Sequence, residues 1–167
     1  MHAKGLKAPD ELYRGFSMSL AIIWPANPKA VSVAEEGNPE LHLQILRTQS
    51  AVYWDSMPRR REIERPLNGY ICIEGAARYK CRVERVVNHG NLLQDEKEHQ
   101  YVPPFRKQCL IGQWENGKPH LPSQTWIKIS KMERLDPPIH ISELTRANGK
   151  PLRAVVGGVV YIQDPNP

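Results

Sequence analysis

The densest chemical signal in the sequence is a run of arginines inside a proline-bounded segment, 56–66. Arg59, Arg60 and Arg61 are consecutive, and Arg65 follows shortly after them. The planar guanidinium group can hold two phosphate oxygens at once, so an ordered loop of this kind binds phosphate well. We therefore expect Arg59, Arg60 and Arg61 to bind phosphate groups. Two glutamates lie in the same segment, and a self-neutralising solvated loop is the alternative interpretation.

Aromatic residues lie immediately before the arginine run. Tyr53 and Trp54 end an apolar segment, and flat rings of this kind stack on nucleic-acid bases. Lys128 near Trp126 repeats the combination of a cation and a ring later in the chain. Large rings also dominate protein cores, which is the competing interpretation for all the tryptophans.

A third set of cations alternates along one predicted strand. Arg78, Lys80 and Arg82 occupy every second position and therefore share one face of an extended chain. We expect these three side chains, together with Lys128, to contact phosphate as well. The alternative is the solvated face of an antiparallel sheet.

Motifs for other chemistries are weak. The sequence contains no G-x-S-x-G motif and no phosphate-binding glycine loop. Two pairs place an imidazole about one helical turn from a carboxylate, Glu96 with His99 and His140 with Glu143. Metal sites built in that way need long facing helices, which a proline-rich chain does not supply. We therefore expect no bound metal, no cofactor and no catalytic residue.

The three cysteines are Cys72, Cys81 and Cys109. Their odd number and the lack of a C-x-x-C spacing argue against a disulfide framework and against a zinc site. Cys72 and Cys81 fall in apolar segments, where a free thiol behaves as a small buried hydrophobic group.

Composition limits the fold that positions these residues. The chain has 167 residues, of which 15 are proline, or about 9% against a usual value of about 5%. This excludes long helical bundles and coiled coils and favours short strands joined by structured loops. Lysine and arginine number 23 against 18 acidic residues, and a basic surplus attracts polyanions. Without a signal-like N-terminus or an apolar run long enough for a bilayer, we expect a cytoplasmic protein with no membrane partner.

Hydrophobic patterning predicts an α+β fold, a small mixed β-barrel with two or three short helices at its rim. Residues 1–17 are expected to form an N-terminal arm and residues 18–167 a single domain. The predicted strands are 19–24, 51–55, 70–74, 78–87, 109–114, 125–135 and 158–163. The strands 70–74 and 78–87 are expected to form a hairpin that breaks at Gly75, and Pro137-Pro138 is expected to stop the strand 125–135. A turn is expected at Asn68-Gly69, and helical turns at 39–47, within 88–104 and at 141–147 with Ser142 as a cap.

Four stretches in this order resemble the PUA-like barrel superfamily. They are Ala21–Pro28 (AIIWPANP), Ala51–Pro58 (AVYWDSMP), Leu67–Val87 and Thr125–Leu144, and they are similar to the EVE and YTH-type branch, with the ASCH type as a near alternative. The resemblance implies a PUA-like barrel with an aromatic pocket for a modified base. Its walls would be Trp24, Asn27, Tyr53 and Trp54, with Ser56 contacting the base edge and Arg59–Arg61 holding the flanking phosphates.

Three functions remain open at this level. The first is a nucleic-acid-binding module, for DNA or RNA, without catalysis; it requires the rings and arginines to share one open concavity. The second is a nucleotide or nucleic-acid hydrolase of the ASCH type, for which Asp55, Glu74 and Lys80 are the candidates. The third is a protein-interaction adaptor that uses Pro103-Pro104-Phe105.

Overall fold

The structure is a computed structural model that describes residues 19–26, 39–114 and 116–167. The expected N-terminal arm, 1–17, and Asn27 lie outside the described residues.

Six strands form one mixed sheet in the order β2-β5-β4-β3-β1-β6. Their bounds are β1 Leu20–Pro25, β2 Val52–Ser56, β3 Leu67–Ile73, β4 Ala76–Asn88, β5 Thr125–His140 and β6 Val160–Gln163. β1 and β3 run parallel, and the other neighbouring pairs are antiparallel. The predicted mixture of short strands and short helices is therefore confirmed.

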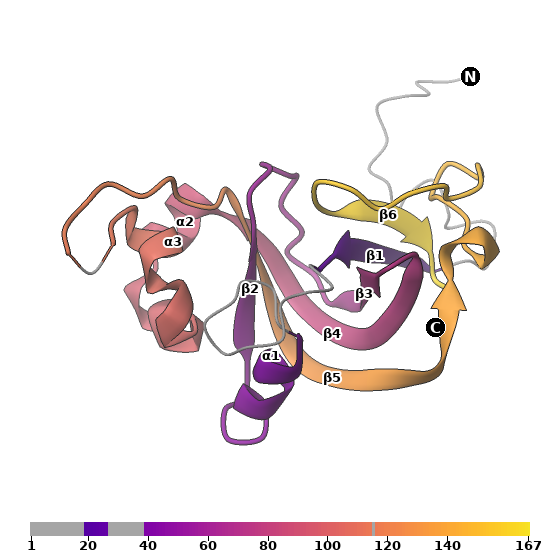
Figure 1. The fold of residues 1–167 in the computed structure, drawn as a ribbon, viewed down its shortest axis with the longest axis horizontal. Helices are drawn as coiled ribbons and strands as arrows, with labels where there is room; N and C mark the ends of the chain where they lie inside the picture. The colour runs from indigo at the N-terminus through magenta and orange to yellow at the C-terminus, as the bar shows by residue number, and fades with distance from the viewer. Residues whose placement is uncertain (1–18, 27–38, 115) are drawn as a thin grey trace.

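The sheet curls strongly without closing, so the expectation of a closed barrel is wrong. β4 and β5 pair along most of their length and bend together into a deep curve (Figure 1). Register shifts interrupt this ladder near Ala77, Arg82 and Val83, and such irregularities bend a strand and increase its twist. The curve brings β2 and β6 back toward each other, but among the described strands no ladder joins these two edges.

The β3–β4 hairpin forms where it was predicted, with its turn at Gly75 between the two expected strands. The separate turn expected before the first of them, at Asn68-Gly69, is wrong. Glu74 and Gly75 connect the strands with φ values of 50° and 77°, the positive angles that tight hairpin turns require. Asn68 and Gly69 are instead inside β3. A side chain at Gly69 would place Cβ 2.6 Å from Cζ3 of Trp24, so glycine is required there by packing.

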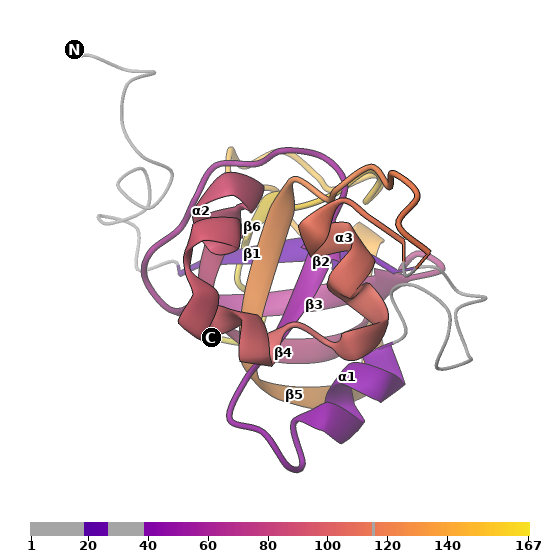
Figure 2. The same cartoon turned by 90° about the vertical axis from the view of Figure 1, so that its left-hand side faces the viewer.

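Most helical segments lie around β2 and the start of β5, away from β1 and β6 (Figures 1 and 2). They are α1 Pro39–Ile45, α2 His89–Gln94, the 3-10 turns η2 Glu96–Tyr101 and η3 Pro104–Arg106, and α3 Lys107–Ile111. The 3-10 turn η4 Ile141–Glu143 instead follows the other end of β5, where the Ile141 amide donates to the carbonyl of Gly75. The predicted strand at 109–114 is wrong. Cys109 and Leu110 lie in α3, where both are buried in the apolar cluster beneath the helices.

Two smaller expectations at the end of β5 also need correction. Pro137 and Pro138 do not stop the strand, which continues to His140. They lie where the pairing between β4 and β5 is interrupted, next to Ala77. Proline has no backbone N–H, but at unpaired positions this costs no hydrogen bond between the strands. The cap of η4 is His140 and not Ser142, because the Ser142 amide donates to His140 Nδ1 at 3.1 Å.

Three apolar clusters make up the core of the described chain. The first fills the concave side of the sheet around Trp24, Trp54 and Tyr79, and the second lies on the opposite face around Tyr70 and Ile162. The third lies beneath α2 and α3. Cys72, Cys81 and Cys109 are free and buried, and burial raises the pKa of the Cys81 thiol.

Candidate functional site

A pocket of about 250 Å³ lies where the two edges of the curled sheet approach each other. The residues that line it come from the end of β1, the end of β2, η3 and the approach to β6. They are Trp24, Pro25, Ala26, Trp54, Asp55, Ser56, Met57, Pro58, Arg106, Gly157 and Gly158. We call it the seam pocket. Three of the residues expected to form a base pocket, Trp24, Trp54 and Ser56, therefore lie together.

The two indoles form one wall of the seam pocket. Their ring centroids are 6.1 Å apart in an edge-to-face arrangement, which is a favourable geometry for paired aromatic rings. His42 packs on Trp54 at 4.5 Å, and Phe105 contacts His42 edge-on. Trp24 is 1% exposed and Trp54 is 3% exposed. Both rings are therefore almost completely buried, and little of either ring is open to the pocket.

A buried ion pair lies beside these rings. Arg106 Nε donates to Asp55 Oδ1 at 2.7 Å, and Arg106 Nη2 donates to the second carboxylate oxygen. Ser123 Oγ donates to Asp55 Oδ2 at 2.7 Å. The Asp55 carboxylate is thus held by a guanidinium group and a hydroxyl. Nothing in the local sequence around Arg106 indicated this role, since its partner is 51 positions away.

Two polar groups of the pocket have no hydrogen-bond partner within the described residues. The indole Nε1 of Trp24 is buried without an acceptor, and an unsatisfied buried donor costs about 1–3 kcal/mol. Ser56 Oγ lies 3.3 Å from the position that a Cβ on Gly158 would take. Gly158 also has a φ of 131°, a backbone angle that favours glycine. A larger residue at 158 would press on Ser56.

Arg60 joins the two edges of the sheet through its side chain. Its guanidinium group donates to the carbonyls of Gly157 at 3.1 Å and Val159 at 3.3 Å. Its backbone amide donates to Thr125 Oγ1 at 2.9 Å. Arg60 is therefore engaged with protein groups, whereas Arg59 and Arg61 on either side are exposed. None of the three arginines lines the seam pocket, so the rings and the arginine run do not share the one open concavity that the first interpretation of the sequence required.

We expect the substitution Arg60→Ala to destabilise the protein by about 1–3 kcal/mol, because two carbonyls lose a charged donor. Arg61→Ala is the matched control, and an exposed position without such contacts should change stability by no more than about 0.5 kcal/mol. Urea denaturation of both variants measures the difference. Equal midpoints for the two would contradict the bridging role of Arg60.

The cations of β4 lie away from the seam pocket. Arg78 Nε donates to the carbonyl of Ile73 at 3.0 Å, and Lys80 Nζ donates to that of Asn166 at 2.6 Å. Arg82 is exposed. Lys80 and Arg82 line a different and larger pocket of about 540 Å³, to which Arg47, Lys131 and Glu133 also contribute.

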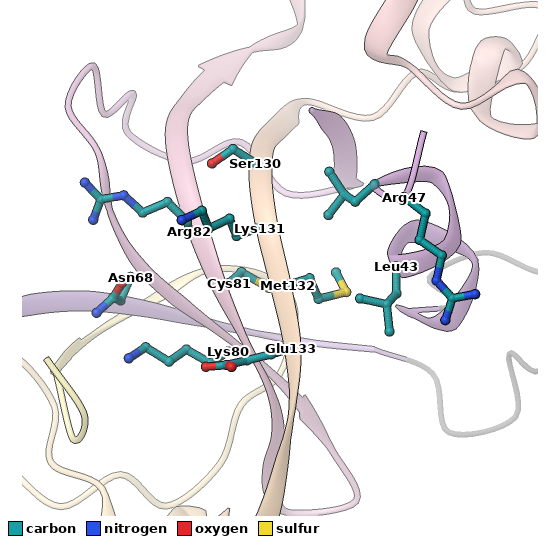
Figure 3. A pocket seen from close by; sticks show the side chains of 11 residues that line it. Leu43, Arg47, Asn68, Lys80, Cys81, Arg82, Ser130, Lys131, Met132 and Glu133 are labelled. Atoms are coloured by element: carbon teal, nitrogen blue, oxygen red, sulfur yellow. The ribbon is translucent and has the colours of Figure 1, made fainter. Parts of the chain in front are cut away.

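Figure 3 shows how the side chains of this larger pocket are distributed. Asn68, Lys80 and Arg82 lie on one side of the β4 and β5 ribbons, and Leu43, Arg47 and Met132 lie on the other. β2 pairs with β5 only as far as Ile129, so this part of β5 has no strand neighbour on that side. The expected phosphate-binding residues Lys80 and Arg82 are thus separated from the aromatic residues.

Tyr53 and Lys128, both expected at the nucleic-acid surface, belong to an internal network. Tyr53 is fully buried, and its hydroxyl donates to Glu98 Oε1 at 2.7 Å. Lys128 Nζ lies 2.8 Å from the same oxygen and 4.8 Å from the centre of the Tyr101 ring. Neither residue lines the seam pocket. Burial, and next the bond to Glu98, raises the pKa of the Tyr53 phenol well above its ordinary value.

Glu98 makes this network sensitive to acid. Burial raises the pKa of Glu98, but hydrogen bonds from Lys128 and Tyr53 outweigh it and hold the pKa below its ordinary value. A carboxylate with a lowered folded-state pKa stabilises the fold above its unfolded pKa, which is about 4.3. That stabilisation is lost as the pH falls through the folded-state pKa.

We therefore expect Lys128→Met to destabilise the protein more at pH 7 than at pH 3, since the ionised fraction of Glu98, which the lysine attracts, falls as the pH is lowered. Lys131→Met is the control, because Lys131 is an exposed lysine of the same strand. Urea denaturation at both pH values compares the two variants. A Lys128→Met effect that is constant between pH 7 and pH 3 would contradict the network.

The candidates for hydrolysis are not brought together. Asp55 lines the seam pocket, Lys80 lines the larger pocket, and Glu74 occupies the β3–β4 turn. His140 and Glu143 cap η4, and His99 Nε2 contacts the carbonyl of Leu92. In the part of the chain that the structure describes, no three potential metal ligands cluster.

The proposed adaptor segment is packed against the body of the protein. Pro103 is buried and Phe105 is half-buried, with its ring against His42. Only Pro104 of the three is exposed. A segment in this arrangement offers little free apolar surface to a partner.

Comparison of the chain with protein-family models, curated proteins and solved structures gives no match. Within the described ranges, no helix has the length and apolar character needed to cross a bilayer.

Proposed function

We propose that this protein is a nucleic-acid-binding module that takes a single base into the seam pocket and performs no chemistry on it. We also propose that its curled sheet is an open variant of the PUA-like barrel. The observation that supports the function best is the seam pocket itself, which is lined by Trp24 and Trp54 together with Ser56, whose hydroxyl can form hydrogen bonds.

The size and chemistry of the seam pocket suit a base. Its volume of about 250 Å³ is just below the range of about 300–1,000 Å³ typical of sites for drug-sized ligands. An extruded base is read through polar contacts to its edge and packing against aromatic or apolar side chains. Ser56 Oγ supplies a donor or acceptor, and Met57 and Pro58 supply apolar surface.

The proposal is tested by fluorescence anisotropy with labelled single-stranded DNA and RNA and with duplexes. A duplex with a central mismatch is expected to bind more tightly than the matched duplex, because the mismatched base costs less to extrude. 2-Aminopurine at that position should brighten as it leaves the stack. Absence of oligonucleotide binding at low salt would overturn the proposal.

Variants of Ser56 test the pocket directly. Ser56→Leu places a larger apolar side chain at the pocket and should abolish the preference for the mismatched duplex, while Ser56→Ala should only weaken it. Ser142→Leu, at an exposed serine outside the pocket lining, is the control and should leave the preference unchanged. A Ser56→Leu protein that is folded and retains the full preference would show that the base binds elsewhere.

A further inference from the structure

The segment between β5 and β6 carries a second concentration of positive charge. From Leu144 to Val159 the sequence contains Arg146, Lys150 and Arg153 and not one carboxylate. The three side chains are exposed and line one concavity of about 590 Å³, together with Asn148, Pro151 and Ala154. We call this concavity the cationic turn.

The backbone of the cationic turn is held in place. Thr145 pairs with Pro151, and the Arg146 amide donates to the carbonyl of Lys150 at 2.7 Å. Leu144 and Leu152 are each 2% exposed and anchor the two ends of the turn in the core. The three cations are therefore carried by a backbone that is already ordered, which reduces the conformational entropy lost when they bind a ligand.

No carboxylate of the described residues forms an ion pair with the cationic turn. Four other cations of the described residues are paired with carboxylates: Arg85 with Glu64 and Asp95, Arg106 with Asp55, Lys128 with Glu98, and Arg134 with Glu40. Within the described part of the chain, the structure shows no ion pair for Arg146, Lys150 or Arg153. Like charges that share a concavity repel one another and attract anions.

We propose that the cationic turn binds the phosphate groups of the same nucleic-acid strand whose base enters the seam pocket. This inference rests on the proposed function and assigns its phosphate contacts. The cationic turn and the seam pocket are joined by a short stretch of backbone, because the segment that carries Arg153 continues to Gly157 and Gly158 in the lining of the seam pocket. Lysine and arginine contacts to phosphate position the strand, and the pocket then reads the base.

The test compares two triple variants that remove the same charge. Arg146→Gln, Lys150→Gln and Arg153→Gln are combined in the first, and Arg47→Gln, Arg82→Gln and Lys131→Gln, from the larger pocket, in the control. Affinity for a labelled single-stranded oligonucleotide is measured by anisotropy over a range of salt concentrations. Since each phosphate contact to a single strand contributes about 0.7 to the salt slope, the first variant should lose about 2. The control should keep the slope of the natural protein.

The outcomes separate this inference from the proposed function. An unchanged slope in the first variant, or equal losses in both, would overturn the inference while binding and the Ser56 effects leave the proposed function standing. If the natural protein binds no oligonucleotide, both fail. A nucleoside monophosphate that binds as tightly as the oligonucleotide, with the same loss in the first variant, would assign the site to free nucleotides and overturn the role in strand binding.

Discussion

Replacing Asp55 with alanine should destabilise the protein by about 3–5 kcal/mol, because a buried guanidinium group loses its counter-charge. The side chains of Asp55 and Arg106 are 6% and 5% exposed. Water cannot readily replace a partner at that depth. Ser123 Oγ would also lose its acceptor, which adds a second unsatisfied group.

An exposed pair of the same chemistry is the matched control. Arg134 makes a two-pronged contact with Glu40, but these side chains are 58% and 42% exposed. Arg134→Ala should therefore cost no more than about 1 kcal/mol. Urea denaturation of both variants gives the comparison, and equal effects of Asp55→Ala and Arg134→Ala would contradict the special position of the buried pair.

A double variant separates the value of the pair from the penalty of breaking it. Asp55→Leu combined with Arg106→Met removes both charges, so neither is left buried without a partner. We expect it to be more stable than Asp55→Ala, because replacing a buried ion pair with apolar side chains is often nearly neutral. A double variant less stable than Asp55→Ala would show that the pair itself contributes a large net stabilisation.

Substitution of Gly69 by alanine should also have a large effect, about 1–3 kcal/mol, from overpacking the core. The new Cβ would lie 2.6 Å from Trp24 Cζ3 and 2.7 Å from Val83 Cγ2. Both neighbours are fully buried or nearly so, and Trp24 must shift to relieve the contact. Because Trp24 lines the seam pocket, Gly69→Ala should also change the tryptophan fluorescence.

Gly90 provides a control with the opposite expected sign. It lies in α2, and an added Cβ would meet nothing within 4 Å. Gly90→Ala should stabilise the protein by about 0.4–1 kcal/mol, since alanine loses less conformational entropy on folding. Thermal or urea denaturation measures both. A Gly69→Ala protein as stable as Gly90→Ala would contradict the claim that Trp24 packs too closely on residue 69 to admit a side chain there.

The local pattern of the sequence was a good guide to individual strands. Apolar runs and alternation predicted 19–24, 51–55 and 78–87 correctly, because the burial of one face is a property of neighbouring residues. The prediction failed at 109–114, where Cys109 and Leu110 are buried in a short helix. A short apolar run does not distinguish a strand from a buried helical turn.

The partners of the charged residues could not be predicted in the same way. Arg60, Lys128 and Lys80 looked alike as solvated or phosphate-binding cations, but each contacts a protein oxygen from a distant segment. The bridge from Arg60 to Gly157 spans 97 positions. No local spacing encodes such a contact.

The sequence by itself determined the mixed α+β composition and the buried free thiols. Only the tertiary structure decided that Trp24, Trp54 and Ser56 gather at an unclosed edge of the sheet, and that Tyr53 turns away from them. The physical reason is that hydrophobic periodicity acts between neighbours in the chain. Pocket formation and ion pairing depend instead on how the long strands β4 and β5 bend, and on which edges that bend brings together.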